Sequence, residues 1–304
     1  MQISNHSFTK HGRLSVLQFS TPEKNTFEYI SGPSAIAKNF VEVREVSFSG
    51  SVNNLELVNN SDKYIFFLDG DILSGAKQNR VLNTSVLVAP NTKLNIPVSC
   101  VEQGRWRSVS SKFSPKDYIS PDSLRAKKLK AVNKNLRRGR GHFANQGEVW
   151  EEVDKFLRIH KSISTTMDFT KVYEDKEKDF DDFVKQFSVN NESNGVAMFM
   201  DNSPLGIDIF NRTDIYQEYF PKRLRGIALE VLNLKDKENT MTEAEANYKT
   251  LSLFDELEKL KYTEHDGVGI GKEKRYNNDK LVALELKYLQ NLIHFTLLNL
   301  EKVN

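Results

Sequence analysis

Cysteine is almost absent from this chain, because Cys100 is the only one among 304 residues. A single thiol cannot form an internal disulfide, so a secreted scaffold held together by disulfides is excluded. The first residues lack a basic region followed by an apolar stretch, and no run of about 20 apolar residues occurs. We therefore expect a cytoplasmic protein with no signal peptide and no membrane partner.

An excess of either charge is also missing. The formal net charge is +2, with 28% charged and 38% hydrophobic residues, which is a globular balance without an overall field that favours nucleic acid. A local basic cluster without any acid nevertheless lies within residues 124–141. Its members are Arg125, Lys127, Lys128, Lys130, Lys134, Arg137, Arg138 and Arg140. Three readings stay open: a nucleic-acid surface, a solvated helix face, or a cover over the phosphates of an anionic ligand.

Patterns for a metal site or a nucleophile are weak. The six histidines show no paired ligand spacing, so the sequence predicts no metal site, and it leaves the cofactor unknown. Three carboxylates around a predicted hairpin could still hold a divalent ion: Asp201, Asp208 and Asp214. Cys100 could act as a nucleophile with His142 or His294 as base, but a lone strand cysteine is more often a buried apolar side chain.

The hydrophobic pattern predicts an α+β fold. β-branched and aromatic runs in the first third indicate strands at residues 14–19, 40–46, 63–68, 83–88 and 93–100. Helical spacing follows at residues 129–136, 149–157 and 180–187. We expect a β-rich sheet of sandwich or barrel type in residues 1–110 and a helical insertion in residues 111–190. Residues 191–304 then form an α+β segment that packs on this sheet and could join it in one domain.

The last segment contains a predicted hairpin at residues 195–210 and closing strands near 281–288 and 292–298. Two helix starts carry capping signals. Asp214 and Gln217 are placed to cap a helix that begins near Thr213, and Thr242 with Glu245 forms a capping box. Pro221 is expected to kink the first of these helices or to restart it.

Polar residues concentrate in two stretches, 75–80 and 99–106. Side chains alternate along a strand, so if residues 94, 96 and 98 face the core, Glu102 continues on the same buried face. A carboxylate there is costly unless it meets a donor or a cation. The nearest cations in sequence are Lys77, Arg80 and Arg105.

These stretches supply the groups that a nucleotide requires. Amides both donate and accept, Arg can bind phosphate through two nitrogens, and Trp can stack on a ring. We predict Glu102 as a catalytic or ribose-binding residue. The predicted ligand-binding residues are Lys77, Gln78, Asn79, Arg80, Asn83, Gln103, Arg105 and Trp106. The alternative is a structural network that pins two strands. The glycine-rich segment 267–272 lacks the spacing of a P-loop.

The runs GAKQNRVLNTS (residues 75–85) and PVSCVEQGRW (residues 97–106) resemble the domain family associated with ADP-ribosylglycohydrolases and rhodanese-phosphatases. Residues 124–127, 145–150, 205–210 and 267–269 are similar as well, so the resemblance covers most of the chain. It implies a place in NAD and ADP-ribose metabolism, with binding or processing of an ADP-ribose-type nucleotide. A non-enzymatic interaction module is the alternative.

Overall fold

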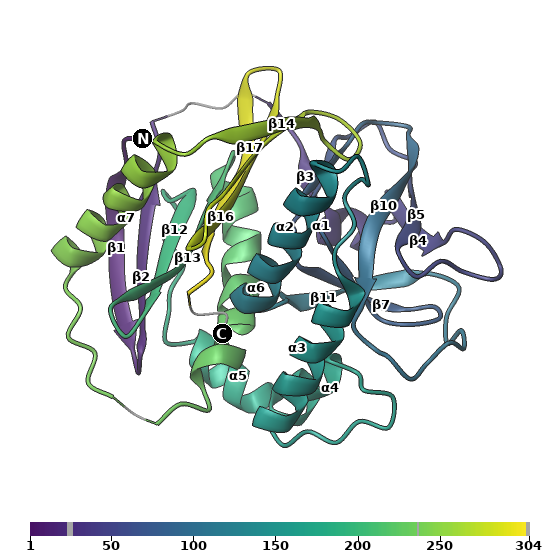
Figure 1. Ribbon diagram of the computed structural model, residues 1–304, viewed down its shortest axis with the longest axis horizontal. Helices are drawn as coiled ribbons and strands as arrows, with labels where there is room; N and C mark the ends of the chain where they lie inside the picture. Colours follow the sequence, from purple (N-terminus) through teal and green to yellow (C-terminus); the bar gives the residue numbers. More distant parts are fainter. Residues whose placement is uncertain (23–26, 236, 302–304) are drawn as a thin grey trace.

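The computed structural model describes residues 1–22, 27–235 and 237–301. Its largest sheet joins both ends of the chain in the order β1-β2-β12-β13-β17-β16-β15-β14, and each neighbouring pair is antiparallel. The strands are β1 (Ser4–His11), β2 (Leu14–Ser20), β12 (Gly195–Met200), β13 (Ser203–Phe210), β14 (Tyr262–Asp266), β15 (Lys272–Asn277), β16 (Leu281–Tyr288) and β17 (Asn291–Asn299). Because β2 pairs with β12, the two ends share one sheet (Figure 1), while the division at residues 110 and 190 stays a prediction.

A second β region carries both polar stretches. It contains a six-stranded sheet in the order β11-β7-β8-β10-β5-β4 and a three-stranded sheet in the order β3-β6-β9. These strands are β3 (Ile30–Ser31), β4 (Val41–Glu45), β5 (Asn54–Asn59), β6 (Ile65–Phe67), β7 (Asp71–Gly75), β8 (Arg80–Leu82), β9 (Val86–Val88), β10 (Lys93–Cys100) and β11 (Phe113–Ile119). The 75–80 stretch connects β7 to β8, and the 99–106 stretch leaves the end of β10. Since β8 pairs with β10, the two stretches lie side by side.

Helices lie between the two β regions and also cover the outer face of the large sheet (Figure 1). α2 (Asp122–Leu136) packs on β15, β16 and β17, while α6 (Thr213–Val231) contacts β13, β3 and β11. α7 (Glu243–Glu258) lies on the opposite face, against β2 and β12. The shorter helices are α1 (Gly32–Ala37), α3 (Gln146–Ile159), α4 (Thr170–Asp175) and α5 (Glu177–Val184). In the part of the chain described, no helix combines the length and apolar character needed to cross a bilayer.

Strand β12 has apolar residues at successive positions, without polar alternation, because both of its faces are buried. Val196 and Met198 belong to the core that includes α6, whereas Ala197 and Phe199 belong to the core that includes α7. Successive side chains of a strand point to opposite faces, and a sheet covered on both faces therefore needs apolar residues at every position.

The predicted α+β class is confirmed. The strands expected at residues 14–19, 40–46, 63–68 and 93–100 correspond to β2, β4, β6 and β10. The capping box of Thr242 and Glu245 starts α7, with both of its hydrogen bonds formed. The strand expected at residues 83–88 is shorter, because β9 begins only at Val86.

α6 begins at Thr213, as predicted, and Asp214 lies in its first turn. Its N-cap, Arg212, makes no side-chain cap bond, and the Asp214 carboxylate pairs with the Arg212 guanidinium at 2.8 Å. Gln217 donates to the Asn191 carbonyl oxygen rather than to its own helix. Pro221 does not restart the helix, because α6 runs through it without interruption.

Candidate functional site

The side chain of Glu102 meets its cation at the end of β10. Arg105 binds it through two parallel hydrogen bonds, Nε to Oε1 at 2.7 Å and Nη2 to Oε2 at 2.6 Å. The backbone N–H of Asn79 adds a contact at 3.2 Å, and Thr166 Oγ1 donates at 2.9 Å. Strand parity therefore placed this carboxylate correctly, and Arg105 is the partner among the three predicted cations.

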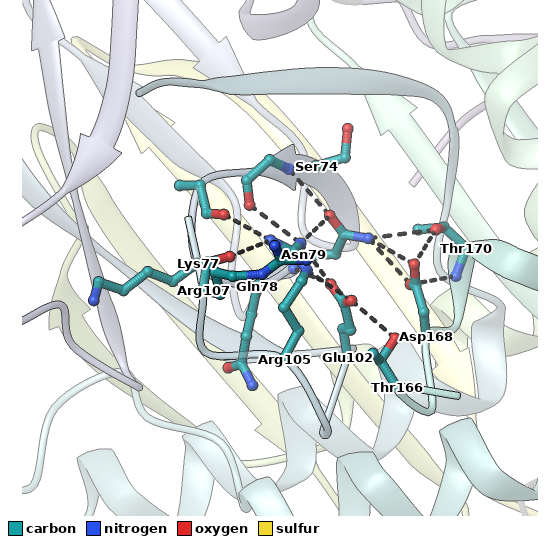
Figure 2. Close-up of polar contacts among 12 residues, drawn as sticks. Ser74, Lys77, Gln78, Asn79, Glu102, Arg105, Arg107, Thr166, Asp168 and Thr170 are labelled. Carbon is teal, nitrogen blue, oxygen red and sulfur yellow. Dashed lines mark hydrogen bonds and ion pairs between the residues drawn. The ribbon is translucent and has the colours of Figure 1, made fainter. Parts of the chain in front are cut away.

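Asn79 connects this ion pair to a second carboxylate, Asp168 (Figure 2). Its Nδ2 donates to both carboxylate oxygens of Asp168 at 3.1 and 3.0 Å, while Thr170 donates to them through its N–H at 2.9 Å and its Oγ1 at 2.8 Å. Burial raises the pKa of Asp168, and the negative charge of Glu102 acts in the same direction. We call these linked residues the Arg105 network; its members are Asn79, Glu102, Arg105, Thr166, Asp168 and Thr170.

The backbone of the 75–80 stretch has positive φ angles at two residues that lie next to this network. Ala76 has a φ of 38°, which is unusual for a residue with a side chain, and its carbonyl oxygen accepts from Arg105 Nη1 at 2.6 Å. Gly75 has a φ of 126°, and a Cβ there would lie 2.6 Å from Ser110 Oγ. The close approach that this glycine permits is therefore to the protein's own chain and not to a ligand.

Arg80 lies fully buried beneath this turn. Its Nη1 contacts Gln78 Oε1 and Cys100 Sγ, both at 2.7 Å, and its guanidinium carbon lies 5.5 Å from the centre of the Trp106 ring. Burial raises the pKa of the Cys100 thiol although Arg80 opposes this. The proposed nucleophile with a histidine base is wrong, because among the described residues no histidine bonds to Cys100: its Sγ contacts Arg80 and the Val52 carbonyl oxygen.

Both proposed bases have other partners. His142 Nε2 lies 2.9 Å from Glu273 Oε2, and His294 bonds to Ser85 and Asp208. The loop that carries His142 is linked to the 99–106 stretch through Asn83, whose Nδ2 donates to the His142 carbonyl oxygen at 3.4 Å and whose Oδ1 accepts from Ser99. Asn83 is fully buried and is held there by Ser99.

Only part of the predicted ligand set reaches the surface. Lys77 points away from the Arg105 network (Figure 2), and Gln103 and Trp106 are exposed. Lys77 Nζ lies 5.6 Å from the Trp106 ring and 5.7 Å from the ring of Phe48, which is completely exposed. Lys77 lines a surface groove of about 590 Å³ together with Arg44, Glu45, Ser47, Phe48, Ala76, Ser108, Ser110 and Ser111. We call this the Lys77 groove.

The basic cluster of residues 124–141 divides into two kinds of residue. Arg125 and Lys128 are buried, and Lys127 pairs with Glu152 at 2.5 Å. Burial lowers the pKa of Lys128 to about 7. The other five line a concave surface of about 660 Å³: Lys130, Lys134, Arg137, Arg138 and Arg140. Aromatic side chains are absent from its lining in the described chain.

Arg125 is the centre of a second charged cluster, which joins β13, α2, α6 and the turn before β7. Its guanidinium contacts Asp69 at 2.9 Å, Asp122 at 3.0 Å and Asp208 at 2.8 Å. Arg223 binds Asp122 at 2.5 Å and Asp208 at 2.7 Å. Although burial alone raises the pKa of Asp208, the two guanidinium groups hold it well below the usual carboxyl range. We call these five residues the Arg125 network.

One candidate metal cluster occurs among the described residues, and it lies inside this network. Asp69, Asp208 and His294 place their ligand atoms within 4.8 Å of one another. Arg125 already occupies the space between the two carboxylates, so a cation would have to displace a guanidinium that balances their charge. These residues therefore do not suit a metal ion.

The three hairpin carboxylates do not form a metal site either. Asp201 pairs with Arg13, Asp214 with Arg212, and Asp208 with Arg125, so each has a different cation. In the glycine-rich segment 267–272, Gly269 is required by close packing against the backbone of β9. A Cβ at Gly269 would lie 2.3 Å from the Leu87 carbonyl oxygen, which accepts a hydrogen bond from the Ile270 N–H.

Several site residues were missed by sequence reasoning. Thr166, Asp168 and Thr170 arrive from the segment after α3, more than sixty positions from Glu102, and no local pattern marks them. For Phe48 the sequence gives only a weak indication of a binding role, because it is a single aromatic residue in the serine- and asparagine-rich run 47–54. Asp69 and Asp71 flank Gly70, but nothing in the sequence indicates their long-range partners.

Fold and site together define a β-rich α+β protein in which a buried carboxylate–guanidinium network supports a turn beside an open surface groove. Residues 2–298 match the family model described as the ARG and Rhodanese-Phosphatase-superfamily-associated Protein domain, ARPP-1, and the chain belongs to this family. No curated protein and no solved structure matches the chain.

Proposed function

We propose that this protein binds an ADP-ribose-like or NAD-derived nucleotide, in the cytoplasm, in the Lys77 groove. The observation that carries the proposal is the pair of exposed aromatic rings, Phe48 and Trp106, each within 6 Å of Lys77 Nζ. Exposed aromatic side chains are costly in water and are typical of surfaces that stack on a ring. A cation beside such rings suits a phosphate attached to a stacked base.

The groove has the size and the polar groups for such a ligand. Its volume of about 590 Å³ lies within the usual range for small-molecule sites. Two serines of the lining, Ser108 and Ser111, offer hydroxyls to phosphate or ribose, whereas the Ser110 hydroxyl is used by Ala76 and Lys112. The family name, which links the domain to ADP-ribosylglycohydrolases, supports the same class of ligand.

The buried residues among the predicted site residues do not contact the ligand in this proposal. Arg80 is fully buried and Glu102 nearly so, and each already bonds to groups of the protein itself. Arg80 therefore does not contact the phosphate in this proposal, and Lys77 does. Glu102 and Arg105 act as positioning residues that hold the 75–80 turn and thereby place Lys77 beside Trp106.

Titration calorimetry with ADP-ribose and with NAD tests this proposal on the native protein and on Lys77→Ala. We expect saturable heat from the native protein and an affinity roughly tenfold lower in the variant, because a charge-assisted contact is lost. Lys178→Ala, which removes an exposed lysine on α5, is the matched control and should bind like the native protein. Absence of saturable heat at millimolar ligand in the native protein contradicts the proposal.

A non-enzymatic structural module is the second candidate, and one observation favours it. Both oxygens of Glu102 and all three nitrogens of the Arg105 guanidinium bond within the chain, as in a network built for rigidity. In that case Arg105→Met lowers the melting temperature, while no nucleotide raises that of the native protein. A thermal-shift screen separates the two, because a ligand that binds the folded state must stabilise it.

Nucleic-acid binding would use the concave basic surface instead. Its five cations form no ion pair within the described chain. Arg137 donates hydrogen bonds to the Asn133 carbonyl oxygen and to Asn277, which leaves the other four to meet phosphates. A gel shift at low ionic strength checks this possibility, with Arg138→Ala plus Arg140→Ala as the variant. Binding that is absent, or that does not weaken with added salt, removes it.

A further inference from the structure

A second cavity, of about 350 Å³, lies away from the polar stretches and from the Lys77 groove. Most of its wall is apolar and comes from α3, β12, β13 and the end of α6, with Phe156, Ile159, Met200, Leu205, Leu229 and Leu234. The volume is within the range of small-molecule sites, and an apolar cavity with a few converging polar groups is the usual form of such a site.

Glu230, near the C-terminal end of α6, is the acidic group in this wall that has no cation. Its Oε1 accepts a hydrogen bond at 2.8 Å from the backbone N–H of Ser123, in the first turn of α2. The N-cap residue of α2, Pro121, makes no side-chain cap bond, so Glu230 supplies the missing acceptor. The Ser123 side chain also hydrogen-bonds to this carboxyl group, and within the described chain no ion pair joins the carboxyl group to a cation.

Charged groups around Glu230 do not neutralise it. Asp122 from α2 also lines the cavity, but its charge is balanced by Arg223 and Arg125. Lys155 from α3 is at the rim and lies 3.6 Å from Glu152. Burial, together with the charge of Asp122 and against the opposing effect of Arg223, raises the pKa of Glu230 to about 7.

We propose that this cavity is a binding site for a small organic amine, with an apolar body among Phe156, Leu205 and Leu229 and an ammonium group on the Glu230 carboxylate. An ammonium ion supplies the cation that the carboxyl group lacks, and a charge-assisted hydrogen bond is stronger than a neutral one. A ligand with its own carboxylate is disfavoured, because it would face Glu230 and Asp122 in a mainly apolar wall. Nothing in this site depends on the Lys77 groove.

Proton release gives the site a recognisable signature. An ammonium group next to Glu230 favours its ionised form, so the amine should displace the proton that the free protein holds on this carboxyl group. At pH 7 about half a proton should leave per amine bound, and at pH 9, where Glu230 is already ionised, none should leave from this group.

The test uses 2-phenylethylamine and its neutral counterpart 2-phenylethanol as probes. Calorimetry on the native protein in two buffers of different ionisation enthalpy, at pH 7 and pH 9, measures both affinity and proton release. We expect saturable amine binding with the stated proton release, and an alcohol affinity roughly tenfold lower. Absence of amine binding at millimolar concentration overturns the proposal, as does equal binding of amine and alcohol without proton release.

Two variants address the two halves of the site. Glu230→Gln keeps the shape and should lower the affinity for the amine roughly tenfold while changing that for the alcohol less. Ile159→Trp, at a wall position that is 45% exposed, should fill the cavity and block both probes with little effect on folding. Glu243→Gln on α7 is the matched control. Amine binding that is unchanged in both cavity variants places the amine elsewhere and overturns the proposal.

Discussion

The Arg125 network and the Arg105 network are made from the same groups but lie in different surroundings. Each has a guanidinium bound to carboxylates through several short hydrogen bonds. The Arg125 side chain is 0% exposed and joins two helices to β13 and to the turn before β7, whereas the Arg105 side chain is 12% exposed and lies between two loops. The first network is therefore enclosed by the fold, and the second borders the surface.

This difference explains what each network can do. Charges removed from water need partners of opposite charge within the protein, and in the Arg125 network each of the three carboxylates contacts at least one of the two guanidinium groups. In the Arg105 network, the same chemistry holds a turn in place while the neighbouring Lys77, Phe48 and Trp106 remain accessible. Similar polar composition in the sequence thus corresponds to a structural role in one region and to a candidate binding role in the other.

The largest expected effect is on stability, from Arg125→Met. This change leaves Asp69 and Asp208 buried without their shared cation, which should lower the free energy of unfolding by about 5 kcal/mol. Urea unfolding followed by circular dichroism measures the loss. Arg138→Met, in the exposed part of the same basic cluster, should stay within about 0.5 kcal/mol of the native protein. Equal effects of the two changes contradict the enclosed character of the Arg125 network.

Arg105→Met should cost less, about 3 kcal/mol, because Glu102 keeps its contacts with Thr166 and with the Asn79 N–H. Adding Glu102→Gln removes the unpaired charge, so the double variant should recover part of this loss. A double-mutant cycle in urea measures the coupling between the two residues. Strictly additive losses mean that the ion pair does not stabilise the turn.

Short-range features of the site were predictable from the sequence, and long-range ones were not. Strand parity along β10 placed Glu102 on a buried face, and its partner Arg105 is only three positions away. Asp168 could not be found in this way, because it reaches Asn79 only through the path of the chain after α3. The fold class could be predicted because the spacing of hydrophobic residues changes from strand-like to helical along the chain. The pairing of β2 with β12 depends on long-range contacts that no local pattern encodes.

In the basic cluster of residues 124–141, residue type alone did not predict that Arg125 is buried. Arg125 stands among seven other cations, so its sequence neighbourhood indicates a solvated or phosphate-binding face. Its burial becomes apparent only when Asp69 and Asp208, 56 and 83 positions away, are placed beside it. Conversely, Arg80 and Asn83 belong to the predicted ligand set but are completely buried.

Glu230 differs from the carboxylates of both networks, because in the described chain no guanidinium forms an ion pair with it. Its pKa is raised from 4.5 to about 7, so the folded state binds this proton more tightly than the unfolded chain does. The resulting stabilisation is complete below about pH 4.5 and is lost as the pH rises through 7. Glu230→Gln does not titrate, and its stability relative to the native protein should rise by about 2 kcal/mol from pH 5 to pH 8.

Urea unfolding at pH 5, 6, 7 and 8 measures this trend, with Glu243→Gln as the exposed control. Asp122 and Arg223 face Glu230 from α2 and α6, and Lys155 lines the same cavity from α3, but each is present in both proteins and cancels in the difference. A difference that does not vary with pH means that Glu230 has an ordinary pKa.

The smallest expected effect on stability comes from Trp106→Ala. This variant tests whether Trp106 binds a ligand rather than supports the fold. Trp106 is 45% exposed, so removing its ring should change the free energy of unfolding by only about 0.5 kcal/mol. The same change should lower the affinity for ADP-ribose by about tenfold, since stacking on an aromatic side chain contributes about 1–3 kcal/mol. Tyr248→Ala removes an aromatic side chain that is 73% exposed on α7, and it should leave both quantities unchanged. A Trp106 variant that loses several kcal/mol of stability places this residue with Arg125, as part of the structure. A stable variant with lost binding supports the distinction between an enclosed network and an accessible one.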